Sequence, residues 1–417
     1  MTTVTNGPLQ AAIYAADTPS IDAFSRLRVS TPATLFESTF RYDLQTLLYE
    51  QITSSGSIAH DAANSCADLS ISAATGLAAM QSYQWVRYQP GKSQLVIITF
   101  TFGSAAANVT RRIGLFNATN SGATVTIGDG IFLEQTGAST VNLRINNSGT
   151  TSDQTIAQAS WNLDPLDGNG PSGITLDLSK SQIMVIDFQW LGVGRVRVGF
   201  DIDGQIIYAH EFLHANSVTN VYMQSATLPV RAELTTGASA TAEMSFICCT
   251  VVSEGGVDNV LGYNFSQGAS VTAGNGARTY ALSLQPKTTF NSIANRSNFT
   301  LDSIEVVVTG NSPVLWELCI GQALTGASFA DVNATYSGMQ VDTAGTLSGN
   351  PAIVAVSGYV AASATSKSSV NRDVSSHYPI TLDAAAAVRA NGRVTVLVTG
   401  QGAASACSVV LNWREIR

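Results

Sequence analysis

The stretch RVRVGFDIDGQIIYAHEF, residues 195–212, decides the fold class of this chain. Apolar and polar residues alternate on both sides of Asp203-Gly204, and a period of two is typical of a half-buried strand. An Asp-Gly pair suits the two positive-φ positions of a type I′ turn, which joins antiparallel strands. The stretch therefore predicts a β-hairpin.

Further short segments with strand character follow one another on both sides of this hairpin, and turn residues separate them. Their close spacing leaves no room for the crossover helices of a parallel sheet. We therefore predict an all-β chain with a jelly-roll-like β-sandwich over residues 84–255. The segments are 83–103, 111–118, 123–137 (with Gly-Asp-Gly as a break between two strands), 139–149, 182–194, 219–236 and 242–256.

The glycine-rich stretch 253–256 marks the expected domain boundary. Beyond it, segments 298–310, 312–321, 351–363 and 392–417 again read as strands, so we predict a second β-sandwich over residues 256–417. Before the first sandwich, Pro-containing turns break the chain. Residues 1–83 are expected to form an extended N-terminal arm and an irregular segment, whose one weak helical candidate is 67–80.

The composition limits the classes of function. Hydrophobic residues make up 45% of the chain and charged residues 12%, against about 25% charged residues in a typical globular protein. A surface of Ser, Thr, Asn, Gln and Gly suits faces that pack against neighbouring subunits. A net charge of -8 argues against nucleic acid as a partner. No apolar run reaches the ~18 residues of a membrane span, and the N-terminus lacks the basic and apolar regions of a signal peptide.

The candidates for chemistry are few. His210 and His214 in HEFLH have the spacing of two zinc ligands on a helix. In a strand, residues four apart lie ~13 Å from each other, so we favour a polar strand end. Asp201 and Asp203 flank the hairpin turn. Asp in a turn usually forms hydrogen bonds with the nearby backbone, and we favour this role. The alternatives are a calcium site and a pair of glycosidase carboxylates.

Five cysteines without a CxxC spacing predict free thiols, most of them buried. We expect no catalytic residue, no metal and no cofactor, and therefore no enzyme. The five tryptophans fit core or interface packing. Trp190, beside glycines in a predicted strand, is the first candidate for stacking against a carbohydrate.

The stretch DAFSRLRVSTPATLFEST, residues 22–39, resembles an N-terminal block of structural proteins from tailed bacteriophages. In that family the block reads DAFGRLRVS-x-P-x-TLFDS, so Ser25 stands in place of Gly and Glu37 in place of Asp. The stretches 47–76 and 81–94 are also similar to that family. The resemblance covers roughly residues 20–250 and does not extend to the second predicted sandwich.

The resemblance implies a non-enzymatic virion structural protein, made in the host cytoplasm, whose N-terminal arm contacts neighbouring subunits. Since the chain lacks the long helices expected of a major capsid protein, we expect a tail-associated component: a tail sheath, collar or fibre protein. The alternatives are a capsid decoration protein and a host-glycan-binding fibre module, and a polysaccharide-degrading enzyme ranks last. The expected partners are further copies of the chain and other tail or head proteins, with host surface glycan in the fibre alternative.

Aromatic, Leu and Arg side chains of the segment 22–43 are the predicted interface anchors, because such residues dominate protein interfaces. We expect the segment to bury more apolar area per residue between subunits than the C-terminal domain does. The alternative is that it packs along its own sandwich. The predicted interface residues are Phe24, Arg26, Leu27, Arg28, Leu35, Phe36, Phe40, Arg41 and Tyr42.

Overall fold

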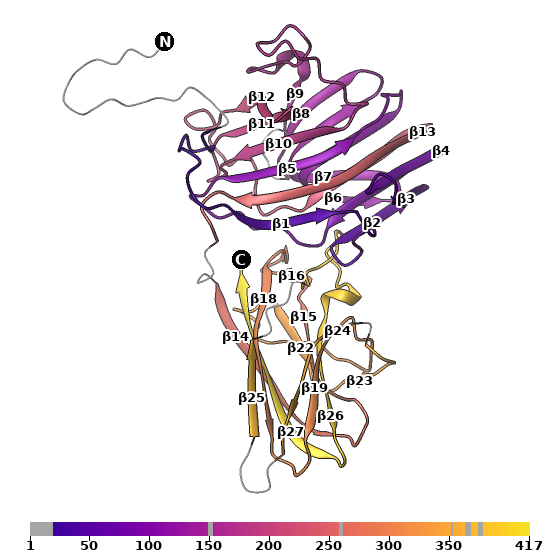
Figure 1. Cartoon of the computed structure of the whole chain (residues 1–417), viewed down its shortest axis with the longest axis vertical. Helices are drawn as coiled ribbons and strands as arrows, with labels where there is room; N and C mark the ends of the chain where they lie inside the picture. Colours follow the sequence, from indigo (N-terminus) through magenta and orange to yellow (C-terminus); the bar gives the residue numbers. More distant parts are fainter. Residues whose placement is uncertain (1–19, 149–152, 258–261, 352, 363–367, 374–377) are drawn as a thin grey trace, which may run out of the picture.

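The structure, a computed structural model, describes residues 20–148, 153–257, 262–351, 353–362, 368–373 and 378–417 (Figure 1). Within these ranges the chain forms strands, and its helical elements are two 3-10 turns, Gln158–Ser160 and Ala390–Gly392. The predicted fold class, all-β with two sandwiches, is confirmed. The described residues contain no helix long and apolar enough to span a membrane.

The first sandwich is built from a single curled sheet. Its strands are β1 (Ala33–Thr39), β2 (Tyr49–Ser54), β3 (Gly56–Asp61), β4 (Cys66–Ser82), β5 (Gln94–Thr101), β6 (Val109–Ser121), β7 (Thr124–Thr136), β8 (Thr140–Asn146), β9 (Gln154–Ala157), β10 (Gln182–Phe188), β11 (Val196–Ile202), β12 (Gln205–Phe212) and β13 (Val230–Ser253). The main order is β12-β11-β10-β5-β13-β6-β7-β8-β9, while β1 and β4 also pair with β13, and β2 and β3 pair with β4.

The 24-residue strand β13 belongs to both layers of this sandwich. Its first part, residues 230–236, pairs with β6, and its last part, residues 245–253, pairs with β5 and β1. The sheet therefore folds over on itself, and its inner faces enclose one apolar core. Figure 1 shows β13 and β4 crossing the whole width of the first sandwich.

The second sandwich has two main sheets, β14-β27-β18-β25 and β21-β22-β15-β26-β19-β24, which enclose a separate core. Its strands are β14 (Tyr263–Ala273), β15 (Thr279–Pro286), β16 (Thr289–Phe290), β17 (Ile293–Ala294), β18 (Asn298–Val308), β19 (Val314–Ile320), β20 (Leu324–Thr325), β21 (Ala330–Asp331), β22 (Met339–Asp342), β23 (Thr346–Leu347), β24 (Ile353–Val360), β25 (Ser368–Asp373), β26 (Val394–Gly400) and β27 (Ser405–Ile416).

The hairpin predicted at 195–212 is present as β11 and β12. Ile202 pairs with Gln205, and the two residues between them, Asp203 at φ 54° and Gly204 at φ 81°, adopt the positive φ values of a type I′ turn. The Asp-Gly pair thus sets the register of both strands, and β10 extends the same sheet on the other side of β11.

The expectation of an irregular segment up to residue 83 is wrong, because β1 to β4 all fall within it. The helical candidate 67–80 lies inside the 17-residue strand β4. Ala67, Leu69 and Ile71 of this strand are buried in the core, alternating with polar residues, so a period of two outweighs the helix propensity of its alanines. Residues 1–19 of the expected arm lie outside the described residues.

Two further boundaries differ from the prediction. Strand structure begins only at Gln94 and at Val230, so residues 83–93 and 219–229 are connections that contribute isolated bridges such as Val86 with Leu228. Gly128-Asp129-Gly130 does not break β7. A Cβ atom on Gly130 would lie 2.1 Å from the Cβ of Phe116, so the glycine lets this ring cross the sheet face.

The two sandwiches touch through the loop that precedes β26. The backbone N–H of Ala384 donates to a carboxylate oxygen of Glu50 at 2.7 Å, and Ala384 packs with Leu77 of the first sandwich. The guanidinium of Arg389 lies 3.8 Å from the ring centroid of Tyr83. Burial is the main cause that raises the pKa of Glu50. These contacts bring residues far apart in the sequence to one interdomain boundary.

The cysteines are free thiols, as predicted. Cys66, Cys249, Cys319 and Cys407 are buried, and Cys248 is half-buried. Burial raises the pKa of the Cys249 thiol to about 11, which keeps it protonated and unreactive at neutral pH.

Candidate functional sites: the N-terminal clasp and the cleft between the sandwiches

Residues 21–30 form a compact turn that we call the N-terminal clasp. One carboxylate oxygen of Asp22 accepts the backbone N–H groups of Phe24 and Arg26, both at 2.9 Å, and the carboxylate pairs with the Arg26 guanidinium at 2.7 Å. Ile21 and Leu27 form an antiparallel bridge across the turn. The family-like block is therefore a folded element.

Ser25 lies at the tip of the clasp with φ 60°, a left-handed conformation that favours glycine. This is the position where the similar phage block has Gly, so the backbone gives a physical reason for that residue. We expect Ser25→Gly to raise the free energy of unfolding by about 0.5 kcal/mol, because relief of the left-handed strain exceeds the added chain entropy. Urea unfolding measures it. Ser30→Gly is the control, because φ of Ser30 is not positive, and it should leave stability unchanged or lower it. A loss of stability in Ser25→Gly would contradict the claim that Ser25 is strained.

The clasp is anchored by the buried carboxylate of Asp187 on β10. Asp187 is fully buried and accepts hydrogen bonds from Arg28 and Arg197, each at 2.5 Å, from the Tyr208 hydroxyl at 2.9 Å and from the Ser93 hydroxyl at 3.0 Å. Burial, and then the charge of Asp187, raise the pKa of Tyr208, so its hydroxyl stays a donor. Four donors converge on this one carboxylate.

Arg28 links the clasp to two other parts of the chain. Its guanidinium donates to the backbone oxygen of Ile21 at 3.0 Å and pairs with Glu254 at 2.8 Å, at the start of the connection to the second sandwich. Arg197 donates to the same Ile21 oxygen at 2.8 Å. Of the two arginines in the stretch RLR, Arg28 therefore anchors the clasp within its own chain.

The nine predicted interface residues divide into two groups. Phe36 and Phe40 are core residues of their own sandwich, Arg28 holds Asp187, and Phe24 and Leu35 are half-buried. Phe36 and Phe40, predicted as interface residues, are core residues instead. Because β1 pairs with β13, alternate side chains of β1 point into the core, and Phe40 directly follows this strand. The exposed members are Arg26, Leu27, Arg41 and Tyr42, with Leu27 62% and Tyr42 80% exposed.

Trp190 is half-buried and packs against the first core. Its indole N–H donates to the backbone oxygen of Met223 at 3.1 Å, and its ring meets that of Tyr88 edge to face at 6.2 Å. These contacts use the polar atom of the indole and cover part of the ring, so the geometry favours packing over the predicted stacking role.

Asp201 and the two histidines of HEFLH have local partners. A carboxylate oxygen of Asp201 accepts the backbone N–H of Gly204 at 2.9 Å, as in an ordinary turn. His210, in β12, accepts the backbone N–H of Asn162 at 3.1 Å, whereas His214 donates to the backbone oxygen of Gly194 at 2.8 Å. The two imidazoles thus bind different segments.

These buried imidazoles predict a pH dependence of stability. Burial lowers the pKa of His210 to about 4, and that of His214 is also lowered by burial. Since the unfolded chain binds these protons more tightly, stability is fully present above pH ~6.5 and is lost as the pH falls toward 4. The urea midpoint should fall as the pH is lowered from ~6.5 toward 4. In His210→Gln the midpoint should depend less steeply on pH. An identical slope in the variant would contradict this assignment.

Charged side chains also form a ladder on the face of β13, β6, β7 and β8 that points away from the main core, where several of them are still buried. Arg231 pairs with Glu233 at 2.8 Å, Glu233 with Arg112 at 2.6 Å, Arg112 with Glu134 at 2.7 Å, and Glu134 with Arg144 at 3.0 Å. Although burial opposes ionisation, Arg112 and Arg144 hold the pKa of Glu134 below its usual value. A glycosidase acid needs a raised pKa, so the environment of Glu134 suits cross-strand ion pairing and not acid catalysis.

The described residues also bring Asp61, Cys66 and Asp68 within 4.8 Å of one another. Burial raises the pKa of the Cys66 thiol to about 11, and Asp68 accepts the Ser245 hydroxyl at 2.6 Å. A metal would need the thiolate, so these contacts favour a protonated Cys66 thiol that donates to Asp68.

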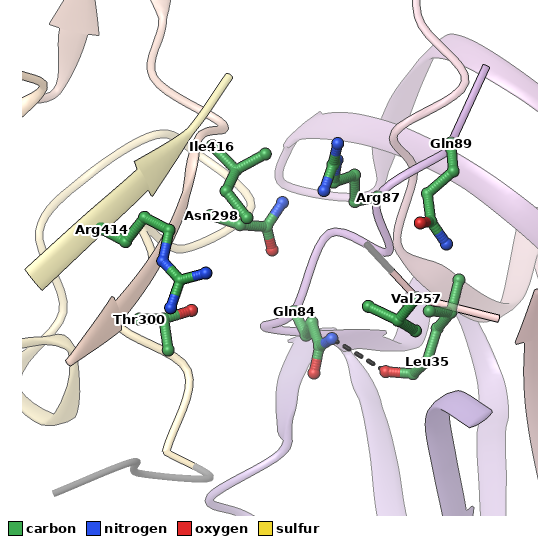
Figure 2. A pocket seen from close by; sticks show the side chains of 9 residues that line it. All are labelled: Leu35, Gln84, Arg87, Gln89, Val257, Asn298, Thr300, Arg414 and Ile416. Carbon is green, nitrogen blue, oxygen red and sulfur yellow. Dashed lines mark hydrogen bonds between the residues drawn. The ribbon is translucent and has the colours of Figure 1, made fainter. Parts of the chain in front are cut away.

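Sequence spacing did not predict a cleft between the two sandwiches (Figure 2). It consists of two adjoining hollows of ≈ 190 Å³ and ≈ 350 Å³ that share Arg87, Asn298 and Ile416. Figure 2 shows Arg87 of the first sandwich and Arg414 of the second on opposite sides of the first hollow. The side chain of Gln84 at its edge donates to the backbone oxygen of Leu35 at 3.0 Å.

The charge of this cleft is one-sided. Arg87, Arg296, Arg414 and Arg417 line it, and its described lining contains no Asp, Glu, His or Cys. Such a lining can bind an anion. We call this site the arginine cleft.

Comparisons with known proteins add little to this picture. No family model matches the chain, and no curated protein matches it. Among solved structures, a Bacillus licheniformis β-glucanase aligns at 12% identity over 52% of this chain and 98% of its own, with a TM-score of 0.33. A legume lectin-like domain from Entamoeba histolytica aligns at 8% identity over 52% and 97%, with a TM-score of 0.35.

A Bacteroides ovatus mixed-linkage-glucan protein is similar at 9% identity over 52% of this chain and 99% of its own, with a TM-score of 0.35. At these TM-scores the likenesses carry no argument, and the fold rests on the strand order given above. The chain is thus defined as a two-sandwich β-protein with an anchored N-terminal clasp and a cationic interdomain cleft.

Proposed function

We propose that this chain is a non-enzymatic structural protein of a tailed-bacteriophage virion, located at the tail and assembled with further copies of itself. The resemblance of residues 22–39 to the phage block motivates the proposal. The low charged fraction and the exposed part of the N-terminal segment agree with it.

The observation that carries the proposal is the edge strand β14, which pairs on one side only within the described part of the chain. This strand is 11 residues long, contains no charged residue, and pairs with β27 in continuous register, at the edge of its sheet. Tyr263 at its start is 63% exposed. Proteins that stay monomeric protect such edges with charges, prolines, bulges or short strands. A long, regular and uncharged edge suits the addition of a strand from another subunit.

Lysines on β14 test this edge. We expect Ser266→Lys with Thr272→Lys to weaken self-association of the purified chain at least tenfold, because each exposed position would place a charge beside the added strand. Sedimentation velocity measures the association, and circular dichroism checks the fold. The matched control, Ser217→Lys with Thr219→Lys on an exposed loop of the first sandwich, should associate like the wild type. Equal association in both variants would contradict a role for this edge.

The composition of purified particles tests the proposed function itself. Mass spectrometry of virions of the phage that carries this gene should detect the chain at several to tens of copies per particle. Its absence from particles, while it is present in infected cells, would overturn the proposal.

A further inference from the structure

The arginine cleft concentrates cationic side chains in a chain that has few of them. Four of its 21 Lys and Arg residues line this one cleft, although the net charge of the chain is -8. Surface cations normally lie interspersed with acids. Solubility therefore does not explain why four arginines cluster between the two sandwiches.

The acidic partners of two of these arginines are not part of the cleft lining. Arg414 pairs with Asp302 at 2.8 Å and Arg417 with Glu415 at 3.3 Å, and neither carboxylate is part of the lining. Both pairs use the Nη2 atom of the guanidinium, which leaves N–H groups on Nε and Nη1 that a bound anion can contact, and low-dielectric walls focus the field of these charges on it.

Arg296 is held in place mainly by backbone groups. It donates to the carbonyl oxygens of Asp383 at 2.6 Å and Ala384 at 3.0 Å, and its guanidinium lies 4.2 Å from the ring centroid of Trp85. Burial lowers its pKa to about 10, so it keeps its charge at neutral pH, while Asp383 and Glu50 act in the opposite direction. This arginine is fixed on a ring before any ligand arrives.

The rest of the lining indicates what kind of anion fits. Side-chain amides and hydroxyls, among them Asn298, Thr300 and Thr227, alternate with the guanidiniums, and Phe290 and Ile416 supply apolar walls. Guanidiniums bind carboxylate or phosphate in a bidentate manner, amides bind hydroxyl groups, and apolar walls pack on a ring face. A hydroxylated ring that carries an anionic group uses all three.

We infer that the arginine cleft binds an acidic saccharide, a sugar unit that carries a carboxylate. The larger hollow, ≈ 350 Å³, lies within the usual range of about 300–1,000 Å³ for small-molecule sites. The inference goes beyond the proposed function and does not depend on it, because the purified chain suffices to test it.

The test is isothermal titration calorimetry of the full chain with three probes: an oligogalacturonate, a neutral glucose oligosaccharide of equal length, and inorganic phosphate. We expect binding of the oligogalacturonate that weakens as salt is added, and at least tenfold weaker binding of the neutral sugar. Equal binding of both sugars would overturn the role of the arginines. Phosphate binding as tight as that of the acidic sugar would overturn the saccharide assignment.

Variants locate the binding in the cleft. Arg414→Gln should weaken oligogalacturonate binding at least tenfold, and so should Arg417→Gln, which changes the last residue of the chain and is a second variant in case the first unfolds. Lys180→Gln removes an exposed cation outside the lining and should bind like the wild type. Unchanged binding in both cleft variants, with melting temperatures intact, would contradict the inference.

Discussion

Asp187→Asn is expected to lower the free energy of unfolding by about 3–5 kcal/mol, because it leaves Arg28 and Arg197 without their buried counter-charge. Both the carboxylate and the Arg197 side chain are fully buried, so water cannot replace the lost interaction. The Tyr208 and Ser93 hydroxyls would lose their shared acceptor as well. Substitutions at surface positions rarely reach this size.

Urea unfolding followed by tryptophan fluorescence measures this loss. Asp203→Asn is the matched control, since Asp203 is exposed in the hairpin turn and Asn tolerates the same left-handed φ. That control should stay within about 0.5 kcal/mol of the wild type. If Asp187→Asn proves equally mild, Asp187 does not anchor the clasp. Limited proteolysis should in addition cut residues 21–30 faster in the Asp187 variant.

Phe40→Ala and Tyr42→Ala are expected to differ sharply, although the two aromatics are two positions apart. Phe40 is fully buried, 5.6 Å from the ring of Tyr49 and 5.0 Å from that of Phe246, so its truncation should cost about 3–5 kcal/mol of stability. Tyr42 is 80% exposed, and Tyr42→Ala should change stability by less than about 0.5 kcal/mol.

The proposed assembly predicts the opposite order for the number of copies per virion, corrected for the yield of soluble protein: Tyr42→Ala should lower this number more than Phe40→Ala does. Tyr42→Ala should fold normally and yet reduce the number of copies per virion, because an exposed aromatic is then lost from the contact. Full incorporation of Tyr42→Ala would remove this residue from the interface, and a mild effect of Phe40→Ala would contradict its place in the core. Thermal unfolding and quantitative mass spectrometry give the two readouts.

The sequence predicts local structure well where turn chemistry is explicit. Asp203-Gly204 identifies its hairpin, because the Asp-Gly pair meets a backbone requirement within two residues. It fails for β4, where alanine-rich composition hides an alternation that cross-strand pairing with β13, β2 and β3 stabilises. The sequence also predicts two separate strands where the structure has the single strand β13. No local pattern shows that one strand continues from one layer of the sandwich to the other.

The sites show the same limit. Aromatic and Arg side chains in residues 22–43 are recognisable as anchors, yet only tertiary pairing decides that Phe40 turns inward and Tyr42 outward. The arginine cleft joins residues near 87, 296 and 414, which no spacing rule connects. Its one sequence signal is the scarcity of cations, which makes any spatial cluster of four of them notable.

The most direct test of the central claim is electron microscopy of purified virions with gold particles bound to an epitope tag at the C-terminus of this chain. The account predicts gold on the tail, in a repeated arrangement that reflects several copies. Gold on the capsid surface would favour the decoration-protein alternative and contradict the tail assignment, and unlabelled particles containing no tagged chain would contradict the structural role altogether.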